Sequence, residues 1–296
     1  MASRRSSQLS YSRKSGHYRR NVSLSHDDVE RVRAAYEEFN ARFAALKAGD
    51  LTGFEDSCTA DILLVPVDGW PVSGRYVGLD GYRRWVREVY GQTAENRFEE
   101  IEAQVVGDYV VATMITRGRA EDDPTEMEAP IGVIHELRDG LIARAWTYLG
   151  HQRALQGAAD ASHIRGAFAE FNARHEELTT PELMRSYHAR WYDPASQIIN
   201  VDGWPVPATY EGFEGYVRWY AENYATYDDV RFDVEAIEPT ANHVVTLARV
   251  SGRPKGEDER LEIQIGLTYE LRDGRIWRVR VYLGHERAVE AARRGA

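Results

Sequence analysis

Near the start of the folded region, apolar residues recur at the spacing of one helix face: Val29, Val32, Tyr36, Phe39 and Phe43. This stripe predicts a helix that begins near Ser25, with two acids in its first turn, and ends at Gly49-Asp50. Leu51 to about Cys58 is predicted to form a short second helix.

The pattern then changes to short apolar runs and alternation, which is typical of strands. A strand is predicted over Ile62–Val67 and a helix over Asp80–Tyr90. Four further strands are predicted near Arg97–Val106, Tyr109–Arg119, Glu126–Leu137 and Leu141–Leu149, with a tight turn at Arg138-Asp139-Gly140. Helices followed by a run of antiparallel strands predict an α+β roll, in which the helices pack on a curved, mostly antiparallel sheet.

This whole pattern occurs twice. The hexapeptide Val-Asp-Gly-Trp-Pro-Val at 67–72 returns at 201–206, an offset of 134 residues, and roughly 35 of about 91 positions paired at this offset are identical. Phe39-Asn-Ala-Arg42 returns at an offset of 132, which places a two-residue insertion between Arg174 and Ile198. A repeat this long indicates a duplicated domain. We predict a disordered basic leader at 1–27, a first copy at 28–157 and a second copy at 161–292, joined by a very short linker around 158–161.

Composition and charge narrow the class of protein. The chain has 296 residues, a net charge of −10 and one cysteine, Cys58. Residues 1–26 carry +6, so the remainder carries −16, and an acidic body does not favour nucleic acid as a partner. No apolar run is long enough to span a membrane, and no secretory signal is recognisable. We expect a cytoplasmic protein whose leader is solvated, although a basic leader could also touch an anionic partner, and its composition resembles that of a transit peptide.

Several short motifs, in the same order in both copies, resemble the SnoaL-like, NTF2-like superfamily, which includes ketosteroid isomerases and polyketide cyclases. They are Ala48-Gly-Asp-Leu51, Tyr76-Val-Gly78 with Gly81, and Leu137–Ile142 running on to Tyr148 and Ala154-Leu155. The resemblance implies two tandem cone-shaped α+β rolls, each with an apolar pocket between its first helix and the concave sheet. It also implies that the copies pack as a pseudo-dimer within one chain, with a further homodimer as an option.

The positions that carry catalysis in these relatives are changed here. The place of the ketosteroid isomerase base falls on Val65 and Ile199, and that of its helix-one tyrosine falls near Arg42 and Arg174. The candidate catalytic residues are therefore others: Asp68, Asp202, His135, His151 and His285. A carboxylate in an apolar pocket has a raised pKa and can exchange protons near neutral pH, but Asp-Gly-Trp-Pro is also typical of a plain turn.

The candidate substrate-binding residues are Tyr36, Arg42, Trp70, Trp85, Glu128, Tyr148, Arg174, Trp204, Trp219, Tyr269 and Tyr282. For the two arginines, simple pairing with a nearby acid is the alternative. If only one copy is active, the differences between copies mark it: His135, Arg75 and Asp61 against Tyr269, Thr209 and Gln197. No nucleotide-binding or metal-binding motif is present in the sequence, so no cofactor and no metal are predicted.

Three functions fit this pattern. The first is a cofactor-independent enzyme, such as a cyclase, isomerase, dehydratase or epoxide hydrolase, that acts on a small hydrophobic molecule. The second is a non-catalytic binding protein for such a molecule. The third is a dimerisation module whose pocket is filled by its own side chains.

Overall fold

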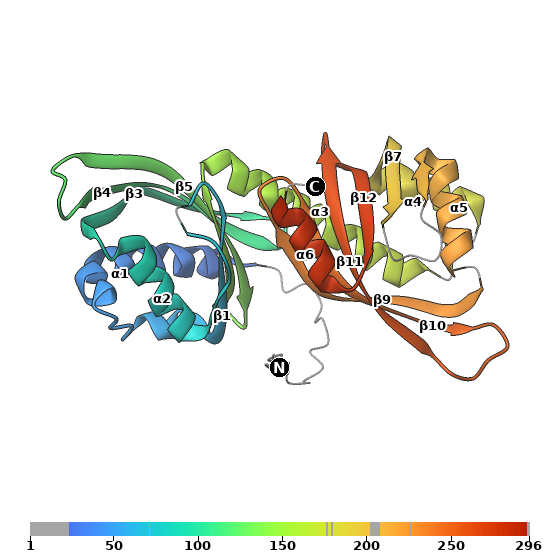
Figure 1. Cartoon of the computed structure of the whole chain (residues 1–296), viewed down its shortest axis with the longest axis horizontal. Coiled ribbons are helices and arrows are strands. Elements are labelled where there is room, and N and C mark those ends of the chain that lie inside the picture. Colours follow the sequence, from blue (N-terminus) through green and yellow to red (C-terminus); the bar gives the residue numbers. More distant parts are fainter. Residues whose placement is uncertain are drawn as a thin grey trace, which may run out of the picture.

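The computed structural model describes residues 24–70, 72–175, 177–178, 180–201, 208–224 and 226–294. They form two α+β units that lie side by side (Figure 1). Most of the predicted leader lies outside the described residues. The predicted fold class is confirmed, because each copy is a six-stranded mixed sheet with helices packed on it.

The first copy has the sheet order β2-β1-β6-β5-β4-β3, in which β1 and β6 run parallel and every other neighbouring pair is antiparallel. Its elements are α1 (His26–Lys47), η1 (Phe54–Asp56), β1 (Cys58–Asp68), β2 (Tyr76–Val77), α2 (Gly78–Tyr90), β3 (Thr93–Val106), β4 (Tyr109–Ala120), β5 (Glu126–Arg138) and β6 (Leu141–Leu149).

The second copy repeats this topology in the order β8-β7-β12-β11-β10-β9. Its elements are α4 (Pro181–Trp191), β7 (Tyr192–Asn200), β8 (Thr209–Glu211), α5 (Gly212–Tyr224), β9 (Tyr227–Pro239), β10 (Val244–Pro254), β11 (Leu261–Arg272), β12 (Arg275–Leu283) and α6 (His285–Arg294).

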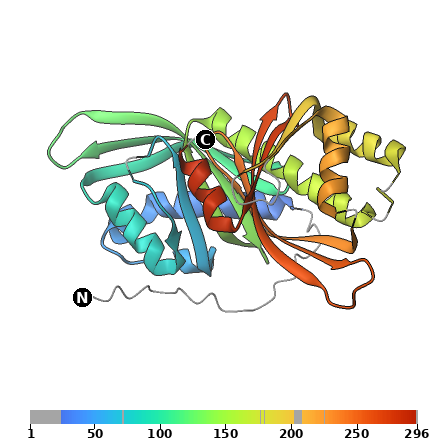
Figure 2. The ribbon, with the colours of Figure 1, turned by 45° about the vertical axis from the view of Figure 1, so that its right-hand side comes forward.

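Helix α3 (His151–Arg174) belongs to both copies. Its first part packs on β4, β5 and β6, and its second part packs on β9 and β10 (Figures 1 and 2). The approach to the first sheet is close, because a Cβ added at Gly132 would lie 2.5 Å from Cβ of Ala154. Residues 158–161, expected as a linker, lie inside a continuous helix, in which Ala158 and Ala161 are buried. The domain boundaries of the two copies stay predictions.

The predicted helix over Leu51–Cys58 is wrong, because only Phe54–Asp56 form a 3-10 turn. Asp50 Oδ1 accepts a hydrogen bond from the backbone nitrogen of Thr52, at 2.9 Å, and Gly53 has a φ of 82°. This left-handed residue ends any helix before one turn is complete. The hairpin turn at Asp139-Gly140 is confirmed, with φ values of 53° and 77° that suit the turns favoured in short hairpins.

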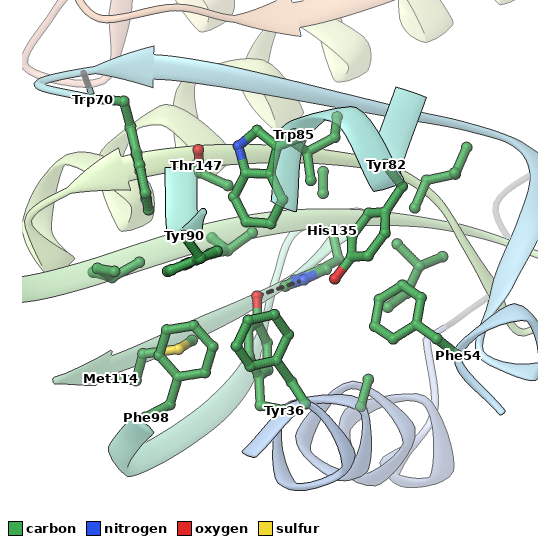
Figure 3. A pocket seen from close by; sticks show the side chains of 18 residues that line it. Tyr36, Phe54, Trp70, Tyr82, Trp85, Tyr90, Phe98, Met114, His135 and Thr147 are labelled. Atoms are coloured by element: carbon green, nitrogen blue, oxygen red, sulfur yellow. Dashed lines mark hydrogen bonds between the residues drawn. The ribbon is translucent and has the colours of Figure 1, made fainter. Parts of the chain in front are cut away.

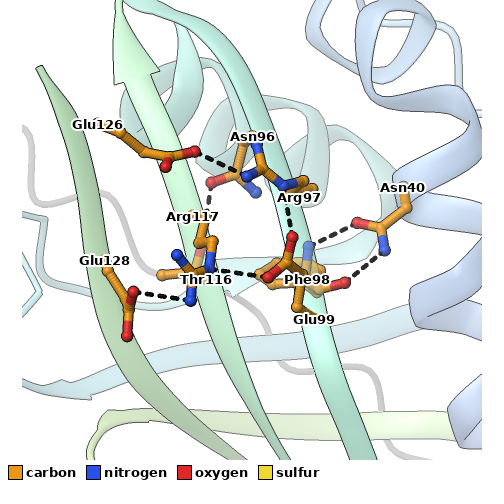
Figure 4. Close-up of polar contacts among 9 residues, drawn as sticks. All are labelled: Asn40, Asn96, Arg97, Phe98, Glu99, Thr116, Arg117, Glu126 and Glu128. Atoms are coloured by element: carbon orange, nitrogen blue, oxygen red, sulfur yellow. Dashed lines mark hydrogen bonds and ion pairs between the residues drawn. The ribbon is translucent and has the colours of Figure 1, made fainter.

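An asparagine from each copy's first long helix fastens that helix to the sheet. Asn40 Nδ2 donates to the backbone oxygen of Phe98 at 2.8 Å, and the Phe98 backbone nitrogen donates to Asn40 Oδ1 at 2.7 Å (Figure 4). Asn172 makes the same two bonds to Phe232. This role gives a physical reason for the recurrence of the Phe-Asn-Ala-Arg sequence.

The copies share one set of buried apolar side chains, to which the first copy contributes Tyr109 and Trp146 and the second contributes Ile237 and Val279. Polar contacts also cross between them, such as the bond from the Tyr148 hydroxyl to the backbone oxygen of Thr240 at 3.2 Å. Within the described ranges, no helix combines the length and apolar character needed to cross a membrane.

Candidate functional site

An aromatic cavity lies in the first copy between α1, α2 and the inner face of the sheet (Figure 3). Its position follows from strand alternation on β5, where Val133 and His135 face the cavity while Gly132 faces α3. The lining residues are Ala35, Tyr36, Phe39, Phe54, Ile62, Leu64, Trp70, Tyr82, Trp85, Tyr90, Phe98, Met114, Ile131, Val133, His135, Ile142, Ala145 and Thr147.

The cavity has a volume of about 60 Å³. That space holds on the order of four water molecules and is far smaller than the roughly 300–1,000 Å³ of pockets that bind drug-sized ligands. It therefore suits a small molecule as it stands, and a larger one requires the aromatic walls to move apart.

Tyr36 and His135 form a hydrogen-bonded pair in this cavity. The Tyr36 hydroxyl lies 3.0 Å from His135 Nε2 (Figure 3). His135 Nδ1 lies 3.2 Å from the backbone oxygen of Val110. Because a carbonyl oxygen only accepts, Nδ1 carries the proton and Nε2 accepts from the tyrosine. Tyr36 thus keeps its own oxygen lone pairs for a ligand.

Burial sets the protonation of both residues. It lowers the pKa of His135 to about 4, although the backbone oxygens of Val110 and Val133 act in the opposite direction. Burial also raises the pKa of Tyr36 well above its ordinary value, with a further contribution from Tyr90. Both groups are therefore neutral at pH 7, and the pair presents hydrogen-bonding groups without charge.

Four other polar groups on the cavity wall have no hydrogen-bond partner among the described protein atoms. They are Trp70 Nε1, Trp85 Nε1, Tyr90 Oη and Thr147 Oγ1. A buried polar group without a partner costs free energy, on the order of 1–3 kcal/mol. Indole nitrogens only donate and the hydroxyls can do so, so this wall matches a ligand with acceptor oxygens.

The second copy changes part of this polar wall, although Tyr224, at the position of Tyr90, also has a buried hydroxyl without a partner among the described residues. Tyr36 corresponds to Phe168, His135 to Tyr269 and Thr147 to Val281. Phe168 and Tyr269 meet edge to face, with ring centroids 6.3 Å apart, in place of the hydrogen-bonded pair. The size of the side chains changes in both directions, since Leu267 stands where the first copy has Val133 and Ala248 stands where it has Met114.

Trp85 and Trp219 occupy equivalent positions in the two copies, but their indole nitrogens differ in hydrogen bonding. In the second copy Trp219 Nε1 donates to Asn200 Oδ1 at 3.0 Å. The first copy has Pro66 at the position of Asn200, and proline has no side-chain acceptor. The indole nitrogen of Trp85 is therefore left for another partner.

Several predicted site residues form ion pairs outside the lining of the cavity. Arg42 pairs with Glu38 and Asp50, and Arg174 pairs with Glu170 and Glu177. Glu128 lies on the opposite face of β5 and pairs with Arg117 at 2.9 Å (Figure 4). A part for these residues in ligand binding stays a prediction.

The histidines that follow β6 and β12 bond to backbone. His151 Nε2 lies 2.8 Å from the oxygen of Met114, and His285 Nε2 lies 3.3 Å from that of Ala248. Tyr148 and Tyr282 are buried outside the lining of the cavity. Asp202 and Trp204 lie outside the described residues, and for Asp68 only the backbone, in β1, is described.

The structure brings together Tyr36, Trp70, Trp85 and His135 from the predicted set. Tyr90 and Thr147 were missed. Comparison of the copies could have pointed to Thr147, because the second copy has Val281 at that position. It could not have pointed to Tyr90, because the second copy has a tyrosine, Tyr224, at the same position. Among the residues that the structure describes, no group of three or more His, Cys, Asp or Glu is placed to hold a metal ion.

Comparison with known proteins gives the family. The sequence model of the SnoaL-like domain matches residues 30–145 and again residues 164–279. No curated protein matches the chain.

Three solved structures that are similar to this chain each cover less than half of it. A putative SnoaL-like polyketide cyclase from Jannaschia sp. CCS1 is 18% identical, covering 45% of this chain and 90% of its own, with a TM-score of 0.34. A putative polyketide cyclase from Xanthomonas campestris pv. campestris is 20% identical, covering 45% and 96%, with a TM-score of 0.33. TerC, co-crystallized with polyporic acid, is 20% identical, covering 42% and 91%, with a TM-score of 0.36.

Proposed function

Because the chain belongs to the SnoaL-like domain family in both of its copies, we propose that it is a cofactor-independent enzyme that acts on a small, neutral, hydrophobic molecule. The reaction takes place in the cavity of the first copy, and the Tyr36–His135 pair supplies its acid–base groups. Cyclases, isomerases, dehydratases and epoxide hydrolases are the reaction types that such a pair serves.

One observation carries this proposal: a neutral, hydrogen-bonded Tyr–His pair in an apolar cavity whose wall also holds polar groups without a partner among the described residues. Among the lining residues that the structure describes, His135 is the only ionisable group besides tyrosines, so this described lining offers no counter-charge to a charged substrate. A neutral ligand with a carbonyl or hydroxyl oxygen satisfies the indole and hydroxyl donors.

The pair suits proton transfer next to a carbonyl. When Tyr36 turns its hydroxyl toward the ligand oxygen, the lone pair of His135 Nε2 is released to take a proton from the adjacent carbon. The electrons of that C–H bond move toward the oxygen, where the tyrosine donates a hydrogen bond to the developing negative charge. Return of the proton to a different atom completes an isomerisation.

A non-catalytic binding protein is the second candidate. The specific observation in its favour is the low pKa of His135, about 4, which makes the resting imidazole a weak base. In that case the same groups only recognise the ligand.

The two candidates are separated with cyclohexanone, a small neutral ketone. Binding is followed by the indole N–H NMR signals of Trp70 and Trp85, and catalysis by the loss of the ketone's α-proton signal in D₂O. The enzyme gives saturable shifts and accelerated exchange, and His135→Gln abolishes the exchange while binding remains. Saturable shifts without exchange support the binding protein, and the absence of shifts contradicts both.

Tyr269→Phe, at the equivalent position of the second copy, is the matched control and should leave both signals unchanged. We further propose that the copies act as an intrachain pseudo-dimer and that the protein is cytoplasmic. Size-exclusion chromatography with light scattering determines whether an additional homodimer forms.

A further inference from the structure

We propose that Glu238, in the second copy, positions the wall of the first copy's cavity by holding Arg75. This inference deepens the proposed function and rests on it. It gives the second copy a task in the reaction although its own counterpart of the cavity lacks the polar pair.

The contact is a bidentate ion pair. Arg75 Nη1 lies 2.5 Å from Glu238 Oε2, and Arg75 Nη2 lies 2.9 Å from Glu238 Oε1. The Glu238 side chain is only 8% exposed. Parallel bonds of this kind fix the guanidinium in orientation as well as in distance, and a buried carboxylate depends strongly on its partner.

Arg75 lies where it can transmit this constraint to the cavity. It ends the connection from β1 that carries Trp70, and it directly precedes β2 and α2. Arg84 Nη2 donates to the backbone oxygen of Arg75 at 3.4 Å. Trp85, the next residue of α2, lines the cavity, so a hydrogen bond links the Arg75 backbone to the helix that carries Trp85.

Helix α2 is braced from the same segment by a second contact. The hydroxyl of Tyr76 donates to Glu88 Oε2 at 2.5 Å. The second copy repeats this brace between Tyr210 and Glu222 at 2.6 Å. The brace is therefore common to the fold, whereas the ion pair at Arg75 is an addition to it.

The ion pair is not repeated by the duplication. At the 134-residue offset, Arg75 corresponds to Thr209 and Glu238 corresponds to Gln104. Neither residue is charged, and both are exposed. The copy with the polar cavity is thus the copy whose wall is held by its neighbour, which links the two differences between the copies in one arrangement.

The test uses the full chain and phenol, a neutral aromatic probe with one oxygen. Its Kd is measured by NMR titration of the Trp70 and Trp85 indole signals in wild type, Arg75→Gln, Glu238→Gln and the charge-exchanged variant Arg75→Glu/Glu238→Arg. We expect each single variant to raise the Kd by about tenfold, within the range of coupling between residues in contact. The exchanged pair should recover most of the wild-type affinity.

Two controls separate positioning from general loss of stability. Arg272→Gln breaks an ion pair with Asp193 inside the second copy and should leave the Kd unchanged. The indole signal of Trp277, which packs beneath Arg272 and Arg278, should keep its position in the Arg75 and Glu238 variants while those of Trp70 and Trp85 move. Thermal unfolding followed by circular dichroism confirms that the compared variants are folded.

The possible failures are distinct. If phenol shifts no cavity indole in the wild-type protein, the proposed function is contradicted. A second failure is that phenol binds the wild type, and that Glu238→Gln and Arg75→Gln show the wild-type Kd and the wild-type chemical shifts of Trp70 and Trp85. In that case the positioning role is contradicted and the proposed function stands. Equal weakening in the Arg272→Gln control also contradicts the positioning role.

Discussion

Acid should destabilise the protein through His135, and the size of the effect follows from its burial. The ring is 3% exposed, and its pKa falls from about 6.5 in an unfolded chain to about 4. Below pH 6.5 the unfolded chain therefore binds a proton that the folded state refuses. The contribution of the neutral, buried His135 to the free energy of unfolding is fully present above pH 6.5 and is lost as the pH falls toward 4.

This difference between the folded and the unfolded pKa of His135 lowers the free energy of unfolding by about 3 kcal/mol at low pH. About 2.5 kcal/mol of that decrease occurs between pH 7.5 and 4.5. His135→Gln removes the titration, while its amide still offers one acceptor and one donor. We expect the free energy of unfolding of the variant to fall less steeply with acid than that of wild type, by about 2.5 kcal/mol over this interval.

The assay is urea unfolding of both proteins at pH 7.5, 6.0, 5.2 and 4.5. Burial, followed by the charge of Arg185, also lowers the pKa of His188, so the comparison with the variant is needed to isolate His135. Identical pH dependence in the two proteins, or an NMR titration of folded His135 near pH 6.5, would refute the reasoning.

Three further predictions concern the packing around the site. Pro66→Asn should give the Trp85 indole the acceptor that Asn200 gives Trp219. Because the indole then no longer needs the ligand, the Kd for phenol in the NMR titration should rise several-fold without loss of thermal stability. An unchanged Kd would mean that Trp85 does not contact the probe. Asn40→Ala removes both hydrogen bonds to the Phe98 backbone and should lower the free energy of unfolding in urea by about 1–3 kcal/mol. Asn172→Ala should lower it by a similar amount, and a decrease below about 0.5 kcal/mol for both variants would contradict the fastening role. Gly132→Ala places a methyl group 2.5 Å from Cβ of Ala154 and should lower the free energy of unfolding by roughly 1–3 kcal/mol. Ala129→Gly, on the same strand but away from α3, serves as a comparison. A Gly132→Ala protein as stable as wild type would show that α3 can move away from the sheet without cost.

The cavity was only partly predictable from the sequence. Helical spacing placed Tyr36 on the apolar stripe of the first helix, and comparison of the copies marked His135 as a difference. The sequence did not show that these two residues meet, because they are 99 positions apart and the hydrogen bond forms only when α1 lies across β5. The exchange of Asn200 in the second copy for Pro66 in the first is visible in the repeat. Its consequence could not be predicted, because it depends on Trp85 lying beside that strand.

The duplication, the α+β class and most of the strands could be predicted from the sequence, because these depend on local periodicity and turn residues. Tertiary structure alone decided which face of β5 borders the cavity, since side-chain alternation leaves both faces equivalent until α3 packs on Gly132. It also decided that residues 158–161 continue a helix: buried alanines there let one helix cover parts of two sheets, and a repeat boundary in the sequence carries no information on packing. The ion pair between Arg75 and Glu238 is likewise a property of the assembled copies, because its residues are 163 positions apart and meet only when the two units are packed together.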